Sequence, residues 1–142
     1  MNNIFFSADT HIGHKNALQY LPNRPFGDSG DIDAHDRWLI DLWQNSMDRG
    51  DRLYFAGDLT FYNSDKARRL LEALPAEKYI AIGNHDQSIR SHLNYFCKAA
   101  QILEVTIKPS QCSFLQENLQ LVICHYPLLD WPNKREGAIM LH

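Results

Sequence analysis

The sequence has 142 residues, of which 44% are hydrophobic and 22% are charged, proportions that are ordinary for a globular protein. Its 14 Lys and Arg side chains oppose 17 Asp and Glu side chains, so the formal net charge is −3. This balance excludes a strongly basic nucleic-acid coat and a polybasic membrane anchor, although it does not exclude nucleic acid as a substrate. A chain of this length is expected to form one domain over residues 1–142.

The sequence shows no signal for export or for membrane insertion. Residues 1–6 have no basic region, and no apolar run approaches the roughly 18 residues that a membrane span needs. The three cysteines (Cys97, Cys112 and Cys124) form no C-x-x-C pair, and their odd number fits a reducing compartment better than a disulfide framework. We therefore expect a cytoplasmic protein that does not contact membranes.

Short apolar runs alternate with amphipathic segments along the chain. We predict strands at 4–6, 53–56, 79–82, 103–107, 119–124 and 138–141, and helices at 32–48, 64–74 and 89–100. Residues 9–30 are polar and rich in Gly, Pro, Asn and Asp, which is typical of a functional loop. Alternating strands and helices favour parallel pairs with helical crossovers, so we expect an α/β fold whose second half is partly antiparallel.

Two of the predicted helices have recognisable beginnings. Asp31 is predicted to cap the helix at 32–48, and Ser64 is predicted to cap the next one. The apolar stripe of the first helix consists of Leu39, Leu42, Trp43 and Met47. Asp36 lies off this stripe, and His35 and His92 are expected to be solvated.

A residue that can bind a metal ion follows each of several predicted strands. In chain order these residues are Asp9 and His11, Asp58, Asn84 with His85 and Asp86, His125, and His142. Because ligands bind at the carboxyl ends of the strands in open α/β sheets, we expect these side chains to converge on one edge. Oxygen and nitrogen ligands without a thiolate suit Zn, Fe, Mn or Ni.

The spacing of these residues predicts how they could share ions. Asp9 and His11 would point to the same side of an extended segment, and Asp58 could bridge two ions with its two oxygens. Taken alone, Asp58 is explained as well by a turn or a helix cap, and His125 by a hydrogen-bonded polar side chain. The simpler explanation would have to hold independently at five positions, which favours a metal site.

Four motifs in this order resemble those of the calcineurin-like metallophosphoesterases: Asp9-Thr10-His11, Gly57-Asp58, Gly83-Asn84-His85-Asp86 and the later His125. The resemblance extends over about residues 4–142. Residues 10–16, 23–26 and 125–127 are similar to a small bacterial and phage subgroup, usually called phosphoesterase or phosphohydrolase. The family implies a layered α/β/β/α sandwich with mixed sheets, and a dinuclear centre of two divalent transition metals (Mn, Fe, Zn or Ni).

The resemblance also implies a role for individual residues. The implied metal ligands are Asp9, His11, Asp58, Asn84 and His125. The first three would hold one ion, and Asp58 with the last two would hold the other. His85 would donate a proton to the leaving group, and Asp86 would orient it. The candidate substrate contacts in the first loop are His14, Asn16 and Arg24, for which a purely structural role in the loop is equally open.

The function implied by the resemblance is a metal-dependent phosphoesterase that hydrolyses a phosphomonoester or phosphodiester with metal-activated water. The substrate would be a phosphate ester, for which a nucleotide is one candidate. The family has a Gly-His-x-His segment of metal ligands after the last strand, whereas this chain stops at Leu141-His142. We therefore expect a domain that lacks its C-terminal end and binds metal more weakly. The alternative is a non-catalytic or metal-depleted binding module on the same fold that acts through a protein partner.

Overall fold

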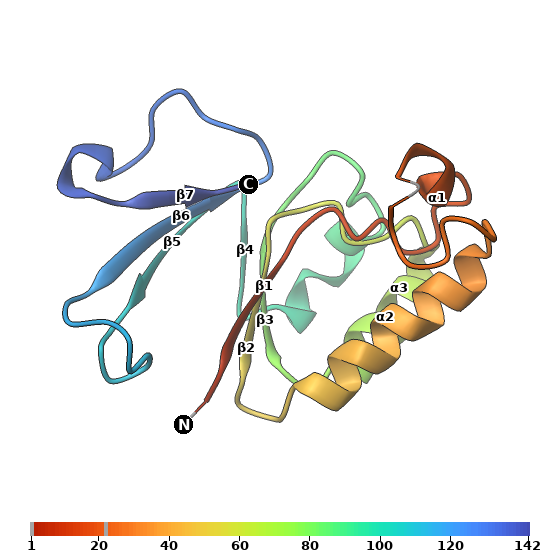
Figure 1. Ribbon diagram of the computed structural model, residues 1–142, viewed down its shortest axis with the longest axis horizontal. Helices are drawn as coiled ribbons and strands as arrows, with labels where there is room; N and C mark the ends of the chain where they lie inside the picture. The colour runs from red at the N-terminus through yellow and green to blue at the C-terminus, as the bar shows by residue number, and fades with distance from the viewer. Residues whose placement is uncertain (1, 22) are drawn as a thin grey trace.

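The computed structural model describes residues 2–21 and 23–142 and contains two β-sheets that face each other (Figure 1). The first sheet is parallel, in the order β1 (Ile4–Ser7), β2 (Arg52–Phe55), β3 (Glu77–Ala81) and β4 (Lys98–Ala100). In the second sheet, β6 (Leu119–Cys124) pairs antiparallel with β5 (Ile102–Ile107) and parallel with β7 (Ile139–Leu141). The predicted α/β class with a partly antiparallel second half is confirmed.

Two longer helices cover the face of the first sheet that is turned away from the second sheet (Figure 1). They are α2 (Ile32–Ser46) and α3 (Ser64–Ala73). The shorter helical segments are α1 (Ala17–Tyr20) and the 3₁₀ turns η1 (Ile89–Tyr95) and η2 (Lys134–Glu136). Within the described parts of the chain, none of these helices is long and apolar enough to cross a membrane.

The alternation of side chains along β2 builds both cores of the protein. Leu53 and Phe55 are fully buried in the core between the first sheet and the helices, where Phe55 packs against Trp43. Tyr54 points to the opposite face and joins Leu103 of β5 in the core between the sheets. Both faces of the first sheet are covered, which explains why its strands are short apolar runs. The polar residues follow at the carboxyl ends of these strands.

The two predicted helix caps have different outcomes. Asp31 caps α2 as predicted, because its Oδ1 accepts a hydrogen bond of 2.9 Å from the Ala34 amide. At α3 the cap is Asn63, whose Oδ1 accepts from the Lys66 amide at 3.0 Å, and Ser64 is the first helical residue. The prediction of Ser64 was wrong by one position, and the Ser64 hydroxyl lies 2.8 Å from Nε2 of His92.

The single helix predicted over 89–100 is wrong. The segment forms η1 and then turns into β4, which pairs with Tyr79–Ala81 at the edge of the parallel sheet. Two alanines in a three-residue strand carry no β-pattern of their own, so only the exposed edge of β3 makes this segment a strand. Cys97, which lies between η1 and β4, is exposed.

The beginning of α2 also differs from the prediction. His35 and Asp36 are each only 2% exposed, whereas Leu42 of the predicted apolar stripe is 45% exposed. The loop that follows β1 packs over the first turns of α2, and the Gly13 amide donates to Asp36 at 2.7 Å. This loop contains the helical turn α1, whose Ala17 anchors it to the protein interior.

Candidate metal centre

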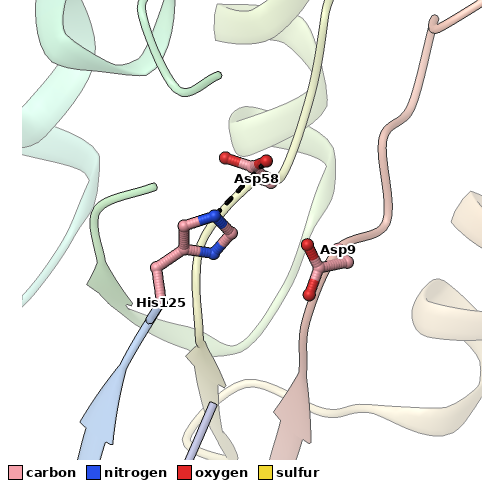
Figure 2. Close-up of side chains that lie close together, drawn as sticks. All are labelled: Asp9, Asp58 and His125. Atoms are coloured by element: carbon pink, nitrogen blue, oxygen red, sulfur yellow. Dashed lines mark ion pairs between the residues drawn. The ribbon is translucent and has the colours of Figure 1, made fainter. Parts of the chain in front are cut away.

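Asp9, Asp58 and His125 meet at the carboxyl ends of the strands (Figure 2). Asp9 follows β1, Asp58 follows β2, and His125 follows β6 of the other sheet. Each offers one ligand atom, and these atoms all lie within 4.8 Å of one another. The predicted convergence of polar side chains from different strands on one edge is therefore present in the fold.

His11 adds a fourth side chain to this group. Its Nε2 lies 3.4 Å from Asp58 Oδ2 and 3.6 Å from Asp9 Oδ1. The same Oδ2 atom of Asp58 lies 3.4 Å from Nε2 of His125. The Asp58 carboxylate, which is 3% exposed, thus stands between two imidazoles that come from different sheets.

The backbone at three of these residues is left-handed. The φ angles are 48° at Asp9, 52° at His11 and 51° at Asp58. The segment from Asp9 to His11 is therefore not extended. The two side chains do lie close together, but the predicted cause, the alternation of side chains along an extended segment, was wrong. Such conformations cost on the order of 1–3 kcal/mol for non-glycine residues and cluster at functional sites.

Hydrogen bonds between the two loops hold this conformation. The Asp9 amide donates to the Gly57 carbonyl, and the His11 amide donates to the Asp58 carbonyl, each at 3.1 Å. Each loop therefore fixes the backbone of the other, and the ligand atoms are positioned by the pairing of the β1 and β2 ends.

Two glycines make room for the ligand side chains. A Cβ on Gly57 would lie 2.6 Å from Nδ1 of His125, and a Cβ on Gly83 would collide with the carboxylate of Asp58. Gly57 also has a φ of +91°, which side-chain-bearing residues rarely adopt. In the sequence each glycine directly precedes a candidate ligand, but the close approach of a ligand side chain to each is visible only in the fold.

The His125 ring and the Asn84 side-chain oxygen lie next to each other in the centre. Nδ1 of His125 is 3.0 Å from the Ala56 carbonyl, to which it can donate when it carries the proton. Nε2 of a neutral ring then presents a lone pair 3.0 Å from Asn84 Oδ1, which also accepts from the Tyr126 hydroxyl at 3.2 Å. A proton or a metal ion on Nε2 would remove this facing of lone pairs, and metal-binding histidines commonly donate their other nitrogen to a carbonyl in this way.

His11 presents an unsatisfied ring nitrogen to the same group. Its Nε2 is buried and has no hydrogen-bond partner among the described residues. Burial lowers the pKa of His11 from its ordinary value, while Asp58 and Asp9 act in the opposite direction. An imidazole nitrogen directed at two carboxylates is a metal ligand in type and orientation, so the residues present fit a divalent cation.

Asp86 has a different role from the one implied by the resemblance. It is fully buried, and its carboxylate accepts from the backbone amides of Asp58 at 2.9 Å, Leu59 at 2.8 Å and Gly83 at 2.8 Å. Within the described parts of the chain, it makes no hydrogen bond to His85. Asp86 therefore ties together the loops after β2 and β3 rather than orienting the imidazole, because its oxygens are directed at backbone donors.

His85 lies at the exposed side of the centre. Its amide donates to Asp58 Oδ1 at 2.9 Å, so the same carboxylate that faces the two histidines also fixes this loop. The ring centroid of His85 is 6.1 Å from that of His11 and 4.7 Å from that of Phe61. His85 is thus beside the group of ligands with its side chain open to solvent.

The three candidate substrate contacts of the first loop have separate surroundings. Arg24 donates to the backbone carbonyls of Thr10, at 2.9 Å, and of Asp9, so it braces the ligand loop. Asn16 is exposed and precedes α1, without a capping hydrogen bond from its side chain. His14 packs on Phe61 with ring centroids 4.3 Å apart. Of the three, only His14 has a ring contact with a candidate metal ligand, His11.

A buried network beneath the ligand loop was missed by the sequence analysis. Asp36 accepts from the Gly13 amide, from the Tyr62 hydroxyl at 3.1 Å, and lies 3.1 Å from Nδ1 of His35. Burial raises the pKa of Tyr62 well above its ordinary range, and Asp36 adds to that effect. The signal available in the sequence was two polar residues next to each other in a helix, which is also the pattern of a solvated face.

Several known proteins are similar to this chain. An uncharacterized protein of Methanocaldococcus jannaschii is 38% identical over 89 residues, which cover 61% of this chain and 48% of that protein. The gene 66 protein of Mycobacterium phage L5 is 30% identical over 92 residues, or 61% of this chain and 41% of that protein. The chain thus spans about half or less of the length of these two relatives.

The gene 66 protein of Mycobacterium phage D29 matches the whole of this chain. It is 30% identical over 171 residues, and the match covers 77% of that protein. The chain belongs to the family of the phage gene 66 proteins. No family model matches this chain.

A solved structure shares the fold of this gene 66 family member. It is that of a protein of unknown function from Aquifex aeolicus, with a TM-score of 0.66 and 25% sequence identity. The match covers 95% of this chain and 66% of the Aquifex chain. The α/β arrangement that carries the candidate metal centre is therefore also found as part of a longer protein.

Proposed function

We propose that this chain is a metal-dependent phosphoesterase that uses the candidate metal centre to hydrolyse a phosphomonoester or phosphodiester. The observation that carries the proposal is the position of Asp58 between His11 and His125, with ring nitrogens and carboxylate oxygens facing one another. A phosphate ester would be the substrate, and a nucleotide is one candidate. The layered α/β/β/α sandwich of the metallophosphoesterases is part of the same proposal, and its first three layers are supported by helices, a parallel sheet and a mixed sheet stacked in that order.

The metal ligands in this proposal come from four loops. They are Asp9, His11, Asp58, Asn84 and His125. When bound, two divalent cations such as Mn, Fe, Zn or Ni would lower the pKa of a water molecule and neutralise the charge of the phosphate. The close approach of the His11 and His125 ring nitrogens to the carboxylates of Asp9 and Asp58 supports a cationic occupant of this group.

His85 is the proton donor in this proposal. Its exposed ring lies beside His11, so it can reach the leaving oxygen of an ester held at the ligand atoms. A positioned general acid contributes about 10²–10⁴-fold to such a reaction. Asp86 supports His85 indirectly, because it fixes the loop after β3 through the Gly83 amide.

Metal content and turnover test the proposal together. We would measure Mn and Zn binding by calorimetry and elemental analysis, and then hydrolysis of p-nitrophenyl phosphate and bis(p-nitrophenyl) phosphate. The expected result is metal-dependent turnover of at least one ester in the original chain. Asp58→Asn should abolish metal binding and turnover, whereas Asp41→Asn, at an exposed acid of α2, should change neither.

The outcomes separate the proposal from its alternative. Metal binding that is lost in Asp58→Asn, without turnover of either ester, would favour a binding module on this fold and contradict the enzyme. Absence of metal from both proteins would contradict the metal centre itself. His85→Ala should retain metal and lose most of its turnover, which distinguishes a proton donor from a ligand.

A further inference from the structure

Four aromatic rings form a continuous stack that begins at the candidate metal centre. We call Tyr20, His14, Phe61 and His85 the ring stack. The centroid distances along it are 6.3 Å from Tyr20 to His14, 4.3 Å from His14 to Phe61, and 4.7 Å from Phe61 to His85. The interplanar angles are 26°, 38° and 31°, so successive rings face one another in tilted or parallel orientation.

The ring stack lies outside both hydrophobic cores of the described residues. Tyr20 is 71% exposed, His85 is exposed, and Phe61 and His14 are half-buried. Core packing therefore does not explain why these rings are gathered. A row of aromatic faces at the surface beside polar groups is the arrangement that proteins use to receive a planar ring.

The two ends of the ring stack lie at different distances from the ligand atoms. His85 and Phe61 adjoin His11, with centroid distances of 6.1 Å and 5.4 Å. Tyr20 lies two ring contacts from His11, through His14. A ligand with one end at the metal ligands and a planar ring on the outer part of the stack needs a spacer between them, which a pentose supplies in a nucleotide.

The backbone holds the ring stack in place. The Phe61 amide donates to the Ile12 carbonyl at 2.7 Å, and the His14 amide donates to the His11 carbonyl at 3.0 Å. Leu18 of α1 is 1% exposed, which fixes the turn that carries Tyr20. The rings are therefore preorganised, and a ligand that stacks on them does not have to order a loop first.

We propose that the outer part of the ring stack, which ends at Tyr20, is the subsite for the planar base of the substrate, so that the substrate is a small phosphate ester of a nucleoside. This inference rests on the proposed function for the reacting phosphate, but not for the base contact. The net charge of −3 and the lack of a basic stripe favour a mononucleotide ester over a polymeric nucleic acid.

Matched substrates test this subsite in the Mn-loaded protein. The diester pair is the p-nitrophenyl ester of thymidine 5′-phosphate against methyl p-nitrophenyl phosphate, and the monoester pair is AMP against ribose 5-phosphate. We expect kcat/KM to be at least about tenfold higher for the nucleoside member, since stacking on one aromatic residue contributes about fivefold to a hundredfold in affinity. Tyr20→Leu and Phe61→Leu should reduce this ratio, whereas Phe114→Leu, at a 93% exposed ring outside the stack, should leave it unchanged.

Binding of adenosine to the metal-free protein tests the base contact without turnover. Saturation-transfer NMR should show transfer from the protein to the H2 and H8 protons of the base, and Tyr20→Leu should weaken it. If neither ester type is hydrolysed but this transfer is present, the proposed function fails and the subsite stands. If esters are hydrolysed with equal kcat/KM within each pair and adenosine shows no transfer, the subsite is overturned and the proposed function stands. Displacement of adenosine by a thymidylate oligomer at far lower concentration than by TMP would overturn the assignment to a small ester.

Discussion

The backbone of Gly57 lies directly against the imidazole of His125, so that a Cβ at residue 57 would stand 2.6 Å from Nδ1 of that ring. The contact joins the end of β2 in the first sheet to the end of β6 in the second. It places the Ala56 carbonyl 3.0 Å from Nδ1 of His125, which leaves Nε2 to face Asp58. The orientation of this candidate ligand therefore depends on the absence of a side chain at residue 57.

Gly57→Ala is expected to displace His125 and to weaken metal binding by at least about tenfold, the usual cost of disturbing the support of a metal ligand. The substitution also places alanine at a φ of +91°, which should lower the free energy of unfolding by about 1 kcal/mol or more. Gly137→Ala is the matched control, because Gly137 has the same φ of +91° and no atom within 4 Å of the added Cβ. Calorimetric metal titration should separate the two variants, and equal metal affinity in both would contradict the contact.

Asp86→Asn is expected to destabilise the protein as well as the metal centre. Its carboxylate accepts three backbone hydrogen bonds, and an amide would turn a donor toward at least one of those donors. The free energy of unfolding should fall by about 1–3 kcal/mol in urea titrations, with weaker metal binding. If Asp86 acted chiefly by orienting His85, turnover would fall while the stability and metal affinity remained those of the original chain.

Asp36 and Tyr62 are expected to act as one unit beneath the ligand loop. Asp36→Ala leaves the Gly13 amide and the Tyr62 hydroxyl without their acceptor, and should cost about 1–3 kcal/mol of stability together with some metal affinity. Tyr62→Phe removes one donor and should cost about 1 kcal/mol. The double variant should be less destabilised than the sum of the single ones, because the hydroxyl has no role once its acceptor is gone. Strict additivity in a urea-denaturation cycle would exclude the coupling.

Asp51 is expected to make the stability depend on pH in the acid range. Hydrogen bonds from the Asp48 and Asn3 amides, at 2.9 Å and 2.6 Å, lower the pKa of Asp51 below its ordinary value of 3.8. The unfolded chain therefore binds the proton more readily, so this contribution is present above the ordinary pKa and is lost as the pH falls through the lower folded value. Asp51→Asn should lower the stability more at pH 7 than at pH 3. Equal losses at the two pH values, measured by urea titration, would contradict this assignment.

Most elements of the fold could be predicted because their signals are local. The strands around Leu53 and Ile80 are apolar runs bounded by turn residues, and Asp31 precedes a helix with one apolar face. The short strand β4 could not be predicted, since Lys98–Ala100 becomes a strand only through its pairing with β3. The cap of α3 was assigned one residue too late, because Asn63 and Ser64 are adjacent and both residue types are favoured as caps.

The candidate site divides in the same way. A rule about the carboxyl ends of strands was enough to select Asp9, Asp58 and His125, which the fold brings within 4.8 Å. The rule said nothing of the left-handed backbone at these positions, of Asp86 as a buried tie between loops, or of the ring stack around Phe61. The metal itself and the phosphoesterase activity stay predictions, to be tested by the titrations above.

By itself the sequence determined the α/β class and the residue types that follow each strand, because hydrophobic periodicity and strand-end chemistry are properties of neighbouring residues. Only the tertiary structure decided which polar side chains face one another and which serve as supports. By residue type Asp36 and Asp86 could be solvated or catalytic. In the fold each is buried and accepts a hydrogen bond from a backbone amide far away in the chain. A carboxylate's role depends on the donors around it, and those donors are brought together by folding.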